Sequence, residues 1–401
     1  MSDRLPRRMV GAIALGTLLN PLNSSMIAVA LISLHSDFGI SVATVTWLVS
    51  GFYLAAAVGQ PLMGRFADLF GPRRIFCSGL LLVCVTSALA PWMPAFGWLV
   101  ALRVLQAFGT SAAYPSGLAI MRAFAQQTVG ESETEVRPPA SALGALTITG
   151  NVSAALGPTL GGFLIVVVGW PAIFLVNVPF TLLGLIVALR WLPADRPRRL
   201  HINDAPGPRS PLAAVREVLR LVDLPGIMLF SGTLVSLLVF LLSMSIGLLW
   251  LLLVVLVAAV LLYLWERRTS SPFFNVRMLA SNRRLISIYA QFAAVNIVFY
   301  STFFGLPLWL EQARGFNPGL TGLIMLPFAG MGILSTFVAV QLIRRWGIKP
   351  SLVFGALALS VGTLLLLLFQ STTPITVLIA FVVILGIPNG FLSLGLQTAL
   401  Y

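Results

Sequence analysis

The run "IGLLWLLLVVLVAAVLLYLW" (residues 246–265) decides the fold class, because none of its twenty residues carries a charge. A helix rises about 1.5 Å per residue, so a run of this length matches the roughly 30 Å hydrocarbon layer of a bilayer. Lipid offers no hydrogen-bond partner to the backbone, and a continuous apolar run without alternation indicates a helix rather than a barrel strand. The stretch therefore predicts a transmembrane helix.

Comparable apolar runs recur along the whole chain. Twelve spans are predicted, at roughly 10–34, 42–63, 75–95, 97–121, 141–167, 171–192, 224–243, 246–265, 286–310, 319–342, 351–370 and 374–397. The composition agrees, since only 9% of the 401 residues are charged while 58% are hydrophobic. So few charges cannot cover a soluble protein of this size. We expect an all-α polytopic membrane protein.

The net charge of +13 could indicate nucleic-acid binding, but the basic residues are unevenly placed along the chain. They concentrate in alternate loops, as at Arg7 and Arg8, at Arg73 and Arg74, and at Arg344 and Arg345. Basic loops of membrane proteins face the cytoplasm. The pattern predicts a multi-pass protein of the cell inner (plasma) membrane with a cytoplasmic N-terminus and no nucleic-acid partner. The first apolar run exceeds the length of a signal-peptide core, so it is interpreted as an uncleaved span.

One long hydrophilic segment, residues 193–223, divides the spans into two sets of six. We interpret it as a cytoplasmic linker whose second part forms an amphipathic helix on the membrane surface. A weak internal echo supports two halves, because "GRFADLFGPRR" (64–74) follows the second span and "QLIRRWGIKP" (341–350) follows the tenth. Parallel repeats of this kind occur in secondary transporters, whose binding site lies between the halves.

Three motifs resemble those of the major facilitator superfamily, and more narrowly its drug:proton antiporters of the 14-span EmrB/QacA type. "GRFADLFGPRR" resembles the family's loop motif, "LRVLQAFGTSAAYPSG" (102–117) its fourth-span motif, and "GNVSAALGPTLGG" (150–162) a fifth-span motif of exporters. The resemblance implies a major facilitator fold and assigns coupling or gating roles to Gly64, Asp68, Gly71, Arg74, Arg103, Gln106, Gly157, Pro158, Gly161 and Gly162. In the family the loop acts as a latch between the halves, and the arginine of the fourth span is associated with proton transfer.

Plainer interpretations of the same motifs stay open. The loop could be a solvated topogenic turn, Arg103 could extend to the outer surface, and the glycines could serve only close helix packing.

The polar stretch "LNPLNSSMIAVAL" (19–31) interrupts the first span. Its residues Asn20, Asn23 and Ser24 are spaced i, i+3 and i+4, so they share one helix face, which we expect to line a central cavity. By resemblance, Asn23 occupies the place of a family acid. Polarity alone adds further cavity candidates: Gln60, Tyr114, Asn151, Gln291, Asn296 and Tyr300. An aromatic stripe around Tyr300 could cradle a flat solute or simply pack.

All 12 acidic residues fall outside the span centres, so the sequence offers no mid-membrane proton carrier. Proton coupling would then rest on Asp68 or be absent. The missing acids also favour neutral or anionic substrates over cationic ones.

The resemblance also divides the chain into segments. These are a six-span bundle (1–192), the linker (193–223), two inserted spans (224–265), a cytoplasmic loop (266–285) and a partial second bundle of four spans (286–401). Against a 14-span relative, the last two spans would be missing, as in a fragment, a shortened product or a protein completed by another chain.

The expected function is secondary active transport that exports small lipophilic or cationic compounds by proton-coupled alternating access. The alternative is a truncated or decayed transporter-like protein without transport activity. An enzyme is not expected, because the chain has no HExxH, GxSxG triad or Walker A motif. Neither a cofactor nor a metal is expected, and the partners would be a small-molecule substrate, protons and the lipid bilayer.

Overall fold

The computed structural model describes residues 6–129, 140–195, 223–243, 245–269 and 281–400, and within them the regular secondary structure is helical. The main helices are α1 (Arg7–Thr17), α2 (Leu19–Phe38), α3 (Val42–Val45), α4 (Trp47–Phe70), α5 (Pro72–Leu89), α6 (Phe96–Val129), α7 (Ala140–Val168), α8 (Ala172–Leu175), α9 (Asn177–Trp191), α11 (Leu224–Ser243), α12 (Trp250–Arg268), α14 (Arg283–Gln312), α15 (Pro318–Trp346), α16 (Ile348–Leu365) and α17 (Ile375–Leu400). The predicted amphipathic stretch of the linker lies outside the described residues.

Eleven helices of the described chain are long and apolar enough to cross a membrane. Twelve spans were expected. The predicted span 97–121 accounts for the difference, because it lies in α6, which is not one of these eleven helices. Arg103, Gln106 and several hydroxyl side chains lower the hydropathy of α6, and these groups are buried against protein. α6 packs along α4 and α5, so its polarity is shielded by neighbouring helices.

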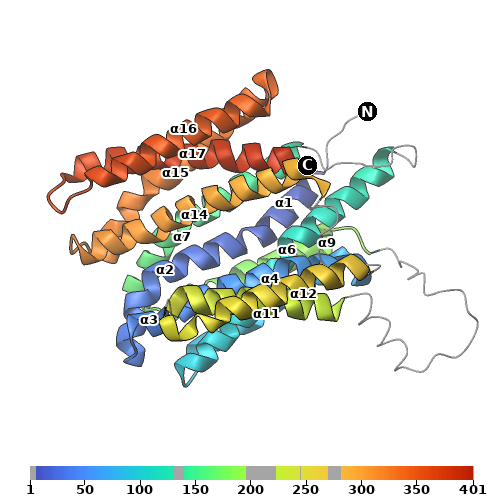
Figure 1. Ribbon diagram of the computed structural model, residues 1–401, viewed down its shortest axis with the longest axis horizontal. Coiled ribbons are helices and arrows are strands. Elements are labelled where there is room, and N and C mark those ends of the chain that lie inside the picture. The colour runs from blue at the N-terminus through green and yellow to red at the C-terminus, as the bar shows by residue number, and fades with distance from the viewer. Residues whose placement is uncertain (1–5, 130–139, 196–222, 244, 270–280, 401) are drawn as a thin grey trace, which may run out of the picture.

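The helices form two groups that meet along α7 and α15 (Figure 1). α1, α2, α4, α5, α6, α7 and α9 pack on one another as the first group, and α14, α15, α16 and α17 form the second. α11 and α12 pair with each other, and α11 also touches α4. α1 begins and α17 ends at the same end of the molecule, which we call the terminal end; the opposite end is the far end.

Large apolar side chains cover the outside of this assembly. Leu253 and Leu256 on α12 and Leu357 on α16 are among those that are more than half exposed. A soluble protein rarely exposes apolar patches of this extent, whereas lipid tails accept them. The surface thus agrees with the membrane assignment made from length and hydropathy.

Candidate functional site: a cavity between the two helix groups

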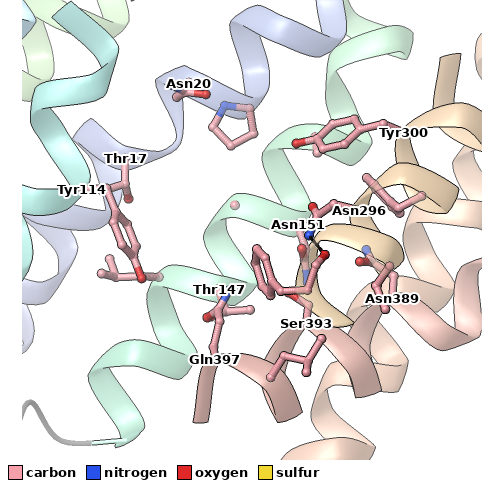
Figure 2. A pocket seen from close by; sticks show the side chains of 18 of the residues that line it. Thr17, Asn20, Tyr114, Thr147, Asn151, Asn296, Tyr300, Asn389, Ser393 and Gln397 are labelled. Atoms are coloured by element: carbon pink, nitrogen blue, oxygen red, sulfur yellow. Dashed lines mark hydrogen bonds between the residues drawn. The ribbon is translucent and has the colours of Figure 1, made fainter. Parts of the chain in front are cut away.

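A cavity of about 300 Å³ lies between the two groups (Figure 2). Its walls come from α1, α2, α4, α6 and α7 on one side and from α14 and α17 on the other. The lining residues are Thr17, Asn20, Pro21, Gln60, Thr110, Tyr114, Leu146, Thr147, Gly150, Asn151, Ala154, Phe292, Val295, Asn296, Phe299, Tyr300, Asn389, Ser393, Leu396 and Gln397. Because α7 begins and α17 ends near these residues, the cavity lies toward the terminal end.

The described lining carries amide, hydroxyl and aromatic groups but no charged side chain. Amide side chains come from both walls, with Asn20 and Gln60 on the first group and Asn296, Asn389 and Gln397 on the second. The aromatic residues on the second wall, Phe292, Phe299 and Tyr300, all come from α14. The cavity can therefore offer hydrogen bonds and flat apolar surface to the same molecule.

Several lining side chains also join the two groups or neighbouring helices. Thr147 on α7 donates to Oε1 of Gln397 on α17 at 2.9 Å, a contact across the groups. Asn151 donates to the hydroxyl of Thr336 on α15 at 3.3 Å. Within the first group, Asn20 donates to the hydroxyl of Thr110 at 3.2 Å.

Six of the nine predicted cavity residues belong to the lining: Asn20, Gln60, Tyr114, Asn151, Asn296 and Tyr300. Ser24 is buried and donates to the backbone oxygen of Pro21, and Gln291 is exposed and donates to Ser287 on its own helix. For the six residues in the lining, contact with a substrate stays a prediction. The remaining three, Asn23, Ser24 and Gln291, do not belong to the lining.

Asn23 lies in a buried pair instead of the cavity. Its amide donates to Oδ1 of Asn177 on α9 at 2.9 Å, and the amide of Asn177 donates back to Oδ1 of Asn23 at 2.8 Å. Both residues are at most 2% exposed. A side chain shared between two helices in this way cannot face an open space, so the expected position of Asn23 is replaced by a structural contact between α2 and α9.

Arg103 is buried beside this pair. Its guanidinium donates to the backbone oxygen of Asn23 at 3.0 Å and to Oε1 of Gln106 at 2.5 Å, and it lies 4.3 Å from the ring centroid of Phe52. Gln106 in turn donates to the hydroxyl of Ser87 on α5 at 2.7 Å. The interpretation that Arg103 extends to the outer surface is not supported, since its side chain is 1% exposed. Its role in proton transfer stays a prediction.

Asn389, Ser393 and Gln397 were not singled out from the sequence. They follow one another at intervals of four residues on α17, with Leu396 beside them in the same lining. That spacing places them on one helix face. The periodic polar stripe in "PNGFLSLGLQ" was the available signal.

The loop motif forms the turn between α4 and α5. Gly71 has φ +100°, in the region that favours glycine, and ends α4. Asp195 accepts hydrogen bonds from the backbone N–H groups of Arg73 and Arg74, both at 2.9 Å, and so caps the start of α5. Gly64 faces Pro115 of α6, and Asp68 lies in the last turn of α4. These contacts of Arg74 stay inside the first group, and a latch to the second group stays a prediction.

The fifth-span motif lies on α7, between α2 and α15. A Cβ atom on Gly157 would stand 1.7 Å from the hydroxyl oxygen of Ser25, and one on Gly161 would stand 3.1 Å from the backbone oxygen of Met26. Gly322 of α15 approaches the other side of α7 at Pro158 and Thr159. Gly162 is buried on the same helix. The motif glycines therefore allow close packing of α7 on α2, while Gly322 allows the close approach of α15.

Comparison with known families and structures agrees with this arrangement. The family model described as Major Facilitator Superfamily matches residues 13–253 and 228–401. The chain belongs to the major facilitator superfamily. It is 39% identical over 396 residues to an uncharacterized MFS-type transporter, YwoD, of Bacillus subtilis, covering 97% of this chain and 81% of that protein.

Two further likenesses are more distant. The Tetracenomycin C resistance and export protein of Streptomyces glaucescens is 29% identical over 366 residues, which cover 86% of this chain and 60% of that protein. The solved structure of the proton:xylose symporter XylE with a bound glucose derivative superposes with a TM-score of 0.59 at 16% identity, covering 97% of this chain and 80% of that chain. At that identity the likeness concerns the fold alone. The chain is thus a multi-pass membrane transporter of this superfamily, and the family is not one of enzymes.

Proposed function

We propose that the chain is a secondary active transporter that exports small, mainly lipophilic compounds across the cell inner membrane by alternating access. The observation that carries the proposal is the polar and aromatic cavity between the two helix groups. Its volume of about 300 Å³ suits a drug-sized ligand, and a site between two rocking halves can be exposed to either side in turn.

The proposal assigns the terminal end to the cytoplasm, because the basic loops lie there by the positive-inside rule. Toward the far end the two groups touch. Tyr53 of α4 lies 5.7 Å from Tyr300 of α14, measured between ring centroids, and Thr159 of α7 donates to the backbone oxygen of Gly322 of α15 at 3.4 Å. Because these contacts hold the far end together and the cavity lies nearer the terminal end, we assign this conformation to the inward-facing half of the cycle, with Thr147 and Gln397 still joining the two groups on the terminal side.

Export rather than uptake is supported by the glycine motif on α7 and by the relative whose name describes resistance and export. Proton movement is the proposed energy source, as is frequent in this superfamily. The described lining holds no carboxylate, so the proton path is proposed to lie outside the cavity, with Asp68 at the end of α4 as its candidate.

Efflux from intact cells tests the function. Efflux-deficient bacteria that express the full chain would be loaded with Nile red, which is neutral, or with ethidium, which is a cation, and retention would be followed with and without a protonophore. We expect the chain to lower retention of at least one dye and the protonophore to restore it. Membrane insertion with unchanged retention of both dyes would favour the non-transporting alternative.

A further inference from the structure

The charged side chain buried deepest in the first group lies outside the cavity. Arg103 is the buried cation among the described residues of this group, and its guanidinium is held by Gln106, the backbone of Asn23 and the ring of Phe52, none of which lines the cavity. The described lining contains neither a carboxylate nor a basic side chain. An ion that leaves water for such a site loses hydration without gaining a counter-charge, which is strongly unfavourable.

The polar groups of the lining have unused hydrogen-bonding capacity. Within the described part of the chain, the side chains of Gln60, Asn389 and Ser393 line the cavity and make no hydrogen bond. Asn296 donates its amide to the backbone oxygen of Phe292 at 2.7 Å, which leaves its own carbonyl oxygen to accept. An amide both donates and accepts, so it matches carbonyl and hydroxyl groups, which are neutral.

The aromatic wall is packed against neighbouring rings, and within it the rings of Phe299 and Tyr300 meet edge to face, with an interplanar angle of 78°. Phe299 stacks on Phe303 and Phe328, with ring centroids 5.7 Å apart in both cases, and lies 5.3 Å from Tyr300. A planar ring that enters the cavity can stack on one ring of this wall while its edge faces the amides. Figure 2 shows Tyr300 of this wall together with the amide side chains of Asn151, Asn296 and Asn389. Aromatic faces attract cations as well, so the choice between the two ligand classes rests on the amides and on the uncharged lining.

We infer that the cavity selects electrically neutral, planar molecules that carry several hydrogen-bonding groups at their edge, and that it discriminates against planar cations of similar size. This inference rests on the proposed transport function and revises its substrate class, from mainly lipophilic compounds to neutral planar ones with a polar edge. Asn389 is the central selecting residue, because the main cavity and a small apolar cavity of about 20 Å³ share Val295, Phe299 and Asn389, and of these three only Asn389 has a polar side chain.

Binding to the purified full chain in lipid nanodiscs tests the inference without requiring flux. Riboflavin serves as the neutral planar probe and ethidium as the planar cation, since the fluorescence of both reports binding. We expect riboflavin to bind at least tenfold more tightly than ethidium. Asn389→Leu should weaken riboflavin binding at least fivefold, while Asn389→Asp, which adds a negative charge at the same place, should strengthen ethidium binding at least fivefold.

Gln291→Leu is the matched control, because Gln291 is an amide on α14 that lies outside the lining. It should leave both affinities unchanged. Ethidium binding as tight as riboflavin binding, no riboflavin binding, or equal effects of the Asn389→Leu and Gln291→Leu variants would overturn the inference. Protonophore-sensitive ethidium efflux, together with ethidium binding tighter than riboflavin binding, would support the transport function and reject this substrate class. Selective riboflavin binding without any efflux would support the substrate class and reject the transport function.

Discussion

At the scale of single residues, the amide pair of Asn23 and Asn177 shows why a transmembrane helix carries so polar a stretch. Two reciprocal hydrogen bonds of 2.9 and 2.8 Å join α2 to α9, and the backbone oxygen of Asn23 also accepts a hydrogen bond from Arg103. Each amide satisfies the other, so the pair is stable only while both partners are present. The polarity of this part of the first span therefore serves contacts between helices as much as the cavity.

We expect Asn23→Leu and Asn177→Leu each to destabilise the protein by about 1–3 kcal/mol, because each leaves one buried amide without its partner. The double variant should lose less than the sum of the two, since it removes both polar groups together. Thermal unfolding midpoints of the four proteins in detergent give the comparison. Additive losses would contradict the pairing.

The sequence could predict the face of Asn20 but not the partner of Asn23. Helical spacing shows that Asn20 and Asn23 lie on the same side of α2. In the structure Asn20 lines the cavity, whereas Asn23 contacts Asn177 of α9. The partner Asn177 lies 154 residues away, and nothing in local periodicity encodes that pairing. Residues on α17 were missed for a different reason, because their polar stripe is dilute within a strongly apolar helix.

At the scale of elements, α7 is the helix on which the two groups meet. It contacts α2 through glycines and α15 on its other side, so its thickness sets the distance between neighbouring helices. The sequence resemblance located these glycines. Which helices they approach could not be predicted, because small-residue motifs permit close packing without naming the partner.

Gly157→Ala tests this packing. Its Cβ atom would stand 1.7 Å from the hydroxyl oxygen and 2.7 Å from the Cβ atom of Ser25, so α2 and α7 must separate. We expect a loss of about 1–3 kcal/mol in stability, as for overpacked cores, and a lower transport rate. Gly144→Ala on the same helix is the control, because its Cβ atom would meet nothing within 4 Å. Equal unfolding midpoints for the two variants would show that the contact is unimportant.

The cap of α5 is a second element-scale prediction. Asp195 accepts from two backbone N–H groups at the first turn, where a negative charge also favours the helix dipole. Asp195→Ala should lower stability by about 0.5–2 kcal/mol, the usual effect of losing a cap. Asp195→Asn should lose less, since its side-chain oxygen still accepts. Thermal unfolding distinguishes the two variants, and the opposite order would argue against capping.

At the scale of the whole molecule, apolar runs of bilayer length predicted the all-helical membrane fold, because apolar length is a direct physical requirement of the bilayer. The number of spans was harder to predict, because a helix that packs among other helices need not be strongly apolar. α6 is shielded by α4 and α5, so it can hold Arg103 and hydroxyl groups that lower its hydropathy below that of the other eleven helices. Burial among helices, which hydropathy does not record, accounts for the difference.

Alternating access requires the far end of the two groups to open, and a crosslink there should stop it. Gly322 approaches Thr159 so closely that its Cβ atom would stand 3.5 Å from the Cα atom of Thr159, within reach of a disulfide. In a Cys77→Ser, Cys84→Ser background, the Thr159→Cys, Gly322→Cys double variant should lose efflux on oxidation and regain it on reduction. Each single cysteine variant should be insensitive to oxidant. Efflux that persists after mass spectrometry has confirmed the crosslink would show that α7 and α15 do not separate at this position, and the rocking of the two groups would have to open elsewhere.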